Sequence, residues 1–304
     1  MPRNFVNLLF VLALLFIITA CVCPSNREDS GEDQPSAVNK TETAETPQTP
    51  LKSNSKPVAN TKADETAGKN KDEGDFIVEH LPVENARYAE IDRQVKEEKL
   101  LEKAAAKLNR ALILPNDLYL RTKDCGEVNA FYNSNDKSVT VCYELMEHFY
   151  KVFKSAGASE EKAYDKMFSA VQFVFLHEIG HALIDQYKLP ITANEEDAAD
   201  RCSSYINIEE LGEEGVRSVL VAAEAFALES KNRSPDARNM ADEHLLQEQR
   251  FYNSLCMTYG SNPTKYSYIV TDGYLPKDRA VRCPSEYERT VQSWVKLLDE
   301  WRKD

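Results

Sequence analysis

Hydrophobic and polar positions divide this chain into helices and one short run of strands. Apolar residues recur at helical spacing among many charges from Ala86 to Ala111, and no Pro or Gly interrupts them before Pro115. Two later segments, DLYLRT and KSVTVCYE, alternate apolar and polar residues, and NSND separates NAFY from the second of them. This pattern predicts antiparallel strands joined by a turn.

One long helix follows the predicted strands. Ser159 is a suitable N-cap, and Glu160 and Glu161 suit the positive end of a helix dipole. The helical pattern continues to about Lys188, and Pro190 ends it because proline has no backbone N–H to donate within a helix.

Helices also make up the rest of the chain. Asn194 is expected to cap the next one, further helices are predicted near 214–230 and 239–256, and a last one ends near Trp301. The folded part of the chain is therefore predicted to be α+β, mostly helical, with a small antiparallel sheet.

The N-terminal 20 residues, MPRNFVNLLFVLALLFIITA, have one early charge at Arg3 and then an apolar run, which is typical of a secretory signal. Ile18-Thr19-Ala20-Cys21 resembles a bacterial lipobox, whose cysteine carries the lipid of the mature protein. We therefore expect residues 1–20 to be a lipoprotein signal peptide and Cys21 to anchor the chain in a membrane leaflet. An ordinary signal peptide and an uncleaved anchor remain the alternatives.

Composition separates a tether from a folded domain. Residues 24–75 are rich in small polar and charged residues and contain no Ile, Phe, Tyr or Trp, so residues 21–75 are expected to be disordered. Residues 76–304 hold both tryptophans and are predicted to be one domain. This domain would face the periplasm or the exterior of the bacterial cell envelope.

Two histidines and a glutamate lie inside the apolar stretch FVFLHEIGHALIDQ. His177, Glu178 and His181 form the motif HExxH on the long helix. Residues four apart lie one turn apart on the same helix face, so the two imidazoles can bind one metal ion and Glu178 can reach a water on that ion. Burying ionisable groups is costly unless they are paired or bind a metal, which favours a metal site over a core helix with satisfied histidines.

A second acidic motif follows the break at Pro190. Glu196 begins ExxAD on the next helix, which can fold back and present Glu196 as the third ligand. Asp200 shares its face and could accept a hydrogen bond from a ligating imidazole. Glu195 is a competing ligand, but Ala199 lies four residues after it, so Glu196 fits better. One zinc ion per chain is favoured, because imidazole and carboxylate ligands with an open position are its catalytic pattern.

These two motifs together resemble the gluzincin metallopeptidases, whose ligands are the HExxH histidines and the glutamate of such a second helix. Three further blocks are similar to those of a bacterial family assigned to the metallopeptidases with unknown function: CGEVNAFYNSNDKSVTVCYEL, DEHLLQEQRFYNSLCMTYGSNP and GYLPKDRAVRCPSEYERTVQSWVKLL. The resemblance covers about 76–304. It implies a zincin-like fold. It also implies an enzyme that hydrolyses a peptide or protein substrate.

In such an enzyme Glu178 would act as the general base. The resemblance also implies a hydrogen-bond donor for the oxyanion. His244 is the candidate, since a neighbouring carboxylate in DEH could orient it, although an ordinary surface histidine fits the sequence equally well. Tyr205 and Tyr187 are weaker alternatives. A strand from 137 to 144 at the edge of the sheet could bind an extended peptide by strand addition.

A protein of another class remains possible on the sequence: a metal-stabilised envelope protein that binds a partner and hydrolyses nothing. Glu178 argues against it, because a purely structural metal site has no use for a base. The net charge of −13 argues against a nucleic acid as partner, since phosphate binding needs basic patches.

The domain contains five cysteines and no CxxC motif, and export would permit disulfides. Cys125 and Cys142 flank the predicted strand-turn-strand and are expected to pair. Cys256 and Cys283 are expected to be joined by the return of a turn-rich loop. Cys202, on the far side of the metal-binding helix, is predicted to be a buried free thiol.

Overall fold

The computed structural model describes residues 70–192, 194–231 and 244–303. The predicted signal peptide, Cys21 and most of the predicted tether lie outside these residues, as do Asp242 and Glu243 of the DEH motif. The main elements are β1 (Phe76–His80), α1 (Ala89–Glu97), α2 (Leu100–Ala111), β2 (Leu118–Lys123), β3 (Ala130–Asn133), β4 (Ser138–Cys142), α3 (Tyr143–Ser155), α4 (Glu160–Tyr187), α5 (Glu195–Tyr205), α6 (Gly212–Lys231), α7 (Gln247–Ser261), α8 (Tyr268–Thr271), α9 (Lys277–Ala280) and α10 (Cys283–Leu298), with short 3-10 segments at Ala86–Tyr88 and Asp299–Trp301. The predicted α+β class, mostly helical, is confirmed.

The four strands form one mixed sheet in the order β1-β2-β4-β3. The predicted hairpin is confirmed, because β3 pairs antiparallel with β4 across the turn at NSND. The sheet as a whole is not antiparallel, since β2 pairs parallel with both β1 and β4. The β1–β2 connection contains α1 and α2, and a parallel pair needs a long crossover of this kind.

The predicted position of the edge strand is wrong. β4, within the range 137–144, is a central strand because it inserts between β2 and β3. After β2 the chain forms β3 at the edge of the sheet, running opposite to β2. It then turns back and forms β4 between β2 and β3. Beside α4 the edge of the sheet is therefore β3, Ala130–Asn133.

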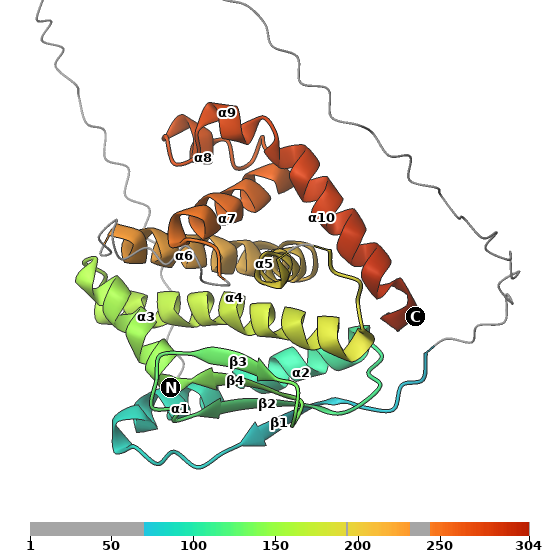
Figure 1. The fold of residues 1–304 in the computed structure, drawn as a ribbon. Coiled ribbons are helices and arrows are strands. Elements are labelled where there is room, and N and C mark those ends of the chain that lie inside the picture. The colour runs from blue at the N-terminus through green and yellow to red at the C-terminus, as the bar shows by residue number, and fades with distance from the viewer. Residues whose placement is uncertain (1–69, 193, 232–243, 304) are drawn as a thin grey trace, which may run out of the picture. The chain divides into compact units, whose positions relative to one another are not determined.

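Helix α4 lies along the sheet and is covered on its other sides by helices (Figure 1). Its N-cap is Ser159, whose hydroxyl accepts a hydrogen bond from the Lys162 backbone, and it ends at Tyr187, so both predicted boundaries are confirmed. Among the described helices α4 alone is long and apolar enough to cross a membrane. However, 72% of its most apolar window is buried inside the protein, as in the core helix of a globular domain.

The helix predicted from Ala86 to Ala111 is broken into two. Lys99 adopts a left-handed conformation with φ 52°, and α1 and α2 lie on either side of it. Both helices contribute to the same core, which also contains Leu118, Leu120 and Val139 of the sheet. Since the hydrophobic pattern continues through Lys99, its periodicity alone could not reveal the break.

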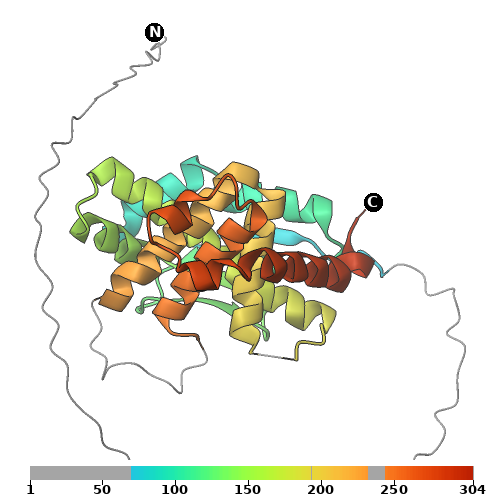
Figure 2. The same cartoon turned by 90° about the horizontal axis from the view of Figure 1, so that it is seen from above.

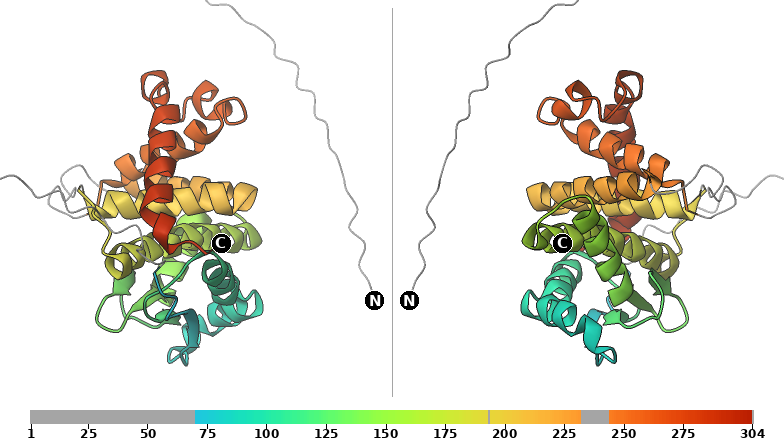
Figure 3. Two further views of the ribbon diagram at one scale, coloured as in Figure 1. Left: turned by 90° about the vertical axis from the view of Figure 1, so that its right-hand side faces the viewer. Right: turned by 90° about the vertical axis from the view of Figure 1, so that its left-hand side faces the viewer.

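The C-terminal helices form a second layer above α4. Figures 1 and 3 show α6 over α4 and then α7 and α10, and Figure 2 shows α10 crossing over the other helices. A separate hydrophobic cluster lies between these elements and includes Phe173, Phe226 and Ile269. This layer brings the start of α7 close to the site described below.

The structure contains both predicted disulfides. Cys125 and Cys142 are bonded with Cα atoms 5.5 Å apart, and Cys256 and Cys283 with Cα atoms 5.0 Å apart. Cys202 is a buried free thiol on α5, as predicted.

Candidate metal centre

Helices α4 and α5 bring His177, His181 and Glu196 together. The two Nε2 atoms of the histidines lie 3.2 Å apart, because four residues of α-helix place their rings one turn apart on one face. Glu196 reaches both rings: its Oε2 lies 3.1 Å from His177 Nε2 and its Oε1 3.3 Å from His181 Nε2. Asn194 is the N-cap of α5: its side-chain oxygen accepts hydrogen bonds from the backbone N–H groups of Glu196 and Asp197. The cap fixes where α5 begins and so where Glu196 lies.

These spacings fit a small tetrahedral metal ion. Ligand atoms about 2.0 Å from a tetrahedral ion are about 3.3 Å from each other. The three contacts of 3.1, 3.2 and 3.3 Å match this edge length without any movement of the side chains. Two imidazoles and one carboxylate are also the donor set of an open catalytic zinc site.

Two carboxylates hold the outer nitrogens of the histidines. His177 donates from Nδ1 to Asp200 at 2.8 Å, and His181 donates from Nδ1 to Glu195 at 2.8 Å. A hydrogen bond at Nδ1 fixes both the tautomer and the ring orientation, so that Nε2 is left to face a metal ion if one binds. Asp200 therefore lies where the sequence predicts it. Glu195, considered as a rival metal ligand, instead orients His181.

Arg250 of α7 completes this arrangement and was missed by sequence reasoning. Its guanidinium donates two hydrogen bonds to Asp200, at 2.8 and 2.7 Å, and its Cζ lies 4.3 Å from the ring centroid of Phe226. The sequence shows only that Arg250 shares a helix face with Met257. The structure buries Met257 and Ser254, so the arginine lies on the core-facing side of α7. A buried cation requires a buried partner.

Glu178 is buried beside the ligands. Its Oε2 accepts a hydrogen bond from the backbone N–H of Tyr132 on β3, at 2.9 Å. Burial raises the pKa of Glu178 above its ordinary value, although the positive charges of His177 and His181 oppose this shift. A carboxylate with a raised pKa is a better proton acceptor near neutral pH.

Hydrogen bonds among the ligand groups shift their pKa values strongly. Burial alone would lower the pKa of His177, but hydrogen bonds to Asp200 and Glu196 raise it to about 9. Burial alone would raise the pKa of Glu196, but hydrogen bonds to His177, His181 and His244 hold it well below its usual range. Glu196 is therefore ionised at neutral pH, the state in which a carboxylate binds a metal.

His244 lies at the open side of the site, next to the start of α7. Its Nε2 is 3.0 Å from Glu196 Oε2, and its ring stacks on that of His177 with centroids 6.1 Å apart. Its side chain is 52% exposed, in contrast to that of His177, so a ligand entering the site from solvent would meet it. The two tyrosines considered as alternatives point elsewhere: the Tyr187 hydroxyl donates to the Ile113 carbonyl, and the Tyr205 hydroxyl accepts from Arg302.

Gly180 allows α4 and α5 to approach closely. A Cβ at this position would lie 3.1 Å from both Ala199 Cα and Cys202 Cβ. The glycine inside HExxH is thus explained by the packing that brings Glu196 to the two histidines.

Fold and site together define a mostly helical α+β protein with a candidate metal centre, formed by the HExxH histidines and a glutamate on the following helix. A family model described as "Putative metallopeptidase" matches residues 80–298, and the chain belongs to this family. Comparison with curated proteins and with solved structures gave no match.

Proposed function

We propose that this protein is a zinc metallopeptidase of the gluzincin type. The observation that carries the proposal is the spacing of 3.1 to 3.3 Å among the ligand atoms of His177, His181 and Glu196, with the Glu178 carboxylate buried next to them. One zinc ion per chain would be held by these three side chains. Membership of a metallopeptidase family supports hydrolysis of peptide bonds as the reaction.

When bound, zinc would lower the pKa of a coordinated water and polarise the scissile carbonyl. Glu178 would accept the proton of the attacking water and later deliver it to the leaving amine. The Tyr132 N–H holds one Glu178 oxygen in place. The other oxygen is left for this proton transfer.

His244 would stabilise the oxyanion. Its imidazole lies beside Glu196 and His177 on the open side of the site, where it can donate to an oxygen that develops negative charge.

An extended peptide would bind along β3 rather than along the strand predicted from the sequence. Since the Tyr132 N–H is directed at Glu178, the backbone edge of β3 that does not pair with β4 faces the metal site. A peptide added to this edge would place a carbonyl next to the metal by main-chain hydrogen bonds.

The sequence supports a location in the bacterial cell envelope. In this proposal residues 1–20 direct export, Cys21 carries the lipid, and the segment to residue 75 holds the domain away from the membrane in the periplasm or outside the cell. Two disulfides in the domain fit an oxidising compartment. Labelling with a radioactive fatty acid tests the anchor: Cys21→Ser should remove the label, and equal labelling of both proteins would contradict it.

The decisive experiment compares the wild type with Glu178→Gln, using the full-length chain. Mass spectrometry should find one zinc per chain in both, and a diverse peptide library should be cleaved at a rate at least about 100-fold lower by the variant. Wild-type turnover in the variant would refute the general-base role. Bound zinc without any cleavage by the wild type would instead favour a metal-stabilised binding protein.

A further inference from the structure

A large cavity lies away from the metal site, between α2 on one side and α4, the segment Ile206–Glu210 and α6 on the other. Its volume is about 810 Å³. None of the metal ligands, nor Glu178 or His244, lines it. Small-molecule sites fall between about 300 and 1,000 Å³, whereas packing defects in protein cores hold at most a few waters.

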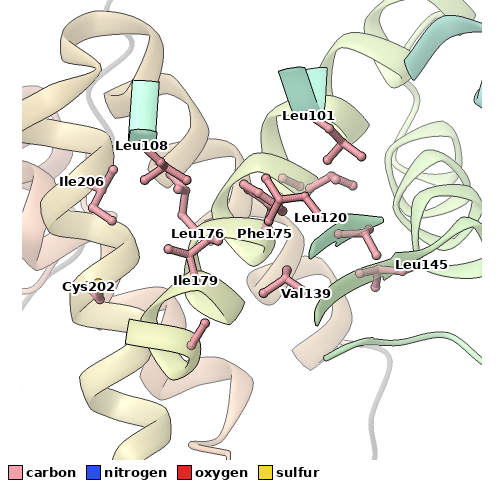
Figure 4. Close-up of a cluster of buried hydrophobic side chains, with 14 of the residues drawn as sticks. Leu101, Leu108, Leu120, Val139, Leu145, Phe175, Leu176, Ile179, Cys202 and Ile206 are labelled. Carbon is pink, nitrogen blue, oxygen red and sulfur yellow. The ribbon is translucent and has the colours of Figure 1, made fainter. Parts of the chain in front are cut away.

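The wall of the cavity is largely apolar. Figure 4 shows Leu101 and Leu108 of α2 opposite Phe175 and Leu176 of α4, with Ile206 beside them. Leu101 and Leu108 are 6% and 7% exposed to solvent, and Phe175 is 6% exposed. Leu118 and Leu120 of the same hydrophobic cluster are 0% exposed, so these three lining side chains keep slightly more accessible surface than the deepest residues of the cluster.

The lining of the cavity follows two helices. Its lining on α2 extends from Leu100 to Ala111, and on α4 from Phe168 to Leu176. At a rise of 1.5 Å per residue these stretches are about 16 and about 12 Å long. This length suits an extended hydrocarbon chain.

Cationic side chains gather where the cavity opens to solvent. Lys107 and Arg110 are exposed on α2 at its rim, and neither has an acidic partner within 4 Å among the residues that the structure describes. The other charged residues of the lining are Lys103, Arg217, Arg302, Glu98, Glu210 and Glu214. Three of these cations are paired, Lys103 with Glu98, Arg302 with Glu210 and Arg217 with Asp165. Among the described residues Lys107 and Arg110 are therefore the lining cations without an ion pair.

We propose that this cavity binds a single-chain anionic amphiphile, with its acyl chain between α2 and α4 and its carboxylate or phosphate head group at Lys107 and Arg110. The apolar wall and the unpaired cations match the two ends of such a ligand. The site is independent of zinc and of peptide hydrolysis.

Photo-crosslinking of the full-length protein in isolated membranes tests the site. The probe is a palmitate analogue with a diazirine in its chain, and the adducts are mapped by mass spectrometry. We expect adducts on the peptides that contain Leu100–Ala111 and Phe168–Leu176. Adducts on the exposed side chains of Tyr274 and Val281, with none on these peptides, would overturn the proposal.

Two matched pairs of variants make the test specific. Ala104→Trp fills the cavity, whereas Ala106→Trp adds the same ring to the exposed face of the same helix. The first should reduce the adduct yield about tenfold and the second should not. Protection of Cys202 from alkylation reports that each variant is folded. Equal yields from the two folded variants would also overturn the proposal.

The second pair concerns charge. Lys107→Glu with Arg110→Glu should reduce the yield about tenfold, whereas Lys277→Glu with Arg289→Glu, two exposed changes outside the cavity lining, should not. These surface changes do not depend on repacking of the core.

Competition identifies the head group. Dodecanoate should displace the probe if the natural ligand is a free fatty acid. Lysophosphatidylglycerol should displace it if the natural ligand is a single-chain phospholipid. Dodecyltrimethylammonium, with the same chain and a positive head, should displace it poorly. Equal competition by this cation would rule out the anionic ligand.

Discussion

Arg250 and Asp200, fifty residues apart in the sequence, form a bidentate ion pair with N–O distances of 2.8 and 2.7 Å. Asp200 also accepts the Nδ1–H of His177. Burial alone would raise the pKa of Asp200, but the charge of Arg250 and the bond from His177 hold it well below its usual range. An arginine of α7 thus keeps ionised the carboxylate of α5 that orients the His177 ring of α4.

We expect Arg250→Met to weaken zinc binding about 10- to 100-fold, because Asp200 would no longer be held against His177. The free energy of unfolding should fall by about 3–5 kcal/mol, the cost of leaving a buried charge without its partner. Competition with a chelator and urea unfolding measure the two effects. Arg201→Met, which breaks a more exposed pair with Asp197 on α5, is the control and should change both values little. Unchanged zinc affinity in Arg250→Met would contradict the role assigned to this residue.

The ligand assignment predicts different results for adjacent glutamates. Glu196→Ala should lose the metal, because its carboxylate reaches both histidine Nε2 atoms. Glu195→Ala should keep one zinc per chain with affinity lowered about tenfold, since it contacts only the outer nitrogen of His181. Metal content after dialysis distinguishes them. Full occupancy in Glu196→Ala with an empty Glu195→Ala would reverse the assignment.

His244→Phe should retain zinc and lower kcat about 100- to 1,000-fold, the loss typical of removing one oxyanion donor. KM should change much less, because the interaction is strongest in the transition state. Steady-state kinetics and metal analysis of the same preparation provide both values. If zinc is lost together with activity, His244 is a metal ligand and not the oxyanion donor.

The substitution Gly180→Ala distinguishes helix propensity from packing, because the two predict opposite changes in the free energy of unfolding. Propensity alone predicts a gain of about 1 kcal/mol for alanine in a helix interior. The distances of 3.1 Å to Ala199 and Cys202 predict instead a loss of about 1–3 kcal/mol, because α5 must move away. Urea unfolding gives the sign. A stabilised variant would show that the two helices tolerate the methyl group.

The cysteines are open to direct chemical mapping. Non-reducing digestion should yield peptides joined through Cys125–Cys142 and Cys256–Cys283. Cys202 should react with iodoacetamide only after unfolding, because burial raises the pKa of its thiol and excludes the reagent. A linked peptide that contains Cys202, or its rapid alkylation in the native protein, would be inconsistent with the structure.

The sequence by itself determined the elements whose causes are local. Ser159 caps α4 with its own hydroxyl, and Asn194 caps α5 in the same way. The shared face of His177 and His181 follows from helix geometry alone. A motif on one helix can therefore be interpreted before anything is known of the fold.

Features that join distant parts of the chain were decided only by the tertiary structure. Whether β2 pairs parallel or antiparallel depends on which strand inserts beside it, and β4 does so only after the chain has reversed through β3. The hydrogen bond from Tyr132 to Glu178 exists because this edge strand lies against α4. The pair of Arg250 with Asp200 requires α7 to pack over α5. Capping and helical periodicity act over a few residues and are written in the local sequence. Strand order and buried ion pairs depend instead on how the whole chain buries its apolar surface, so no short segment specifies them.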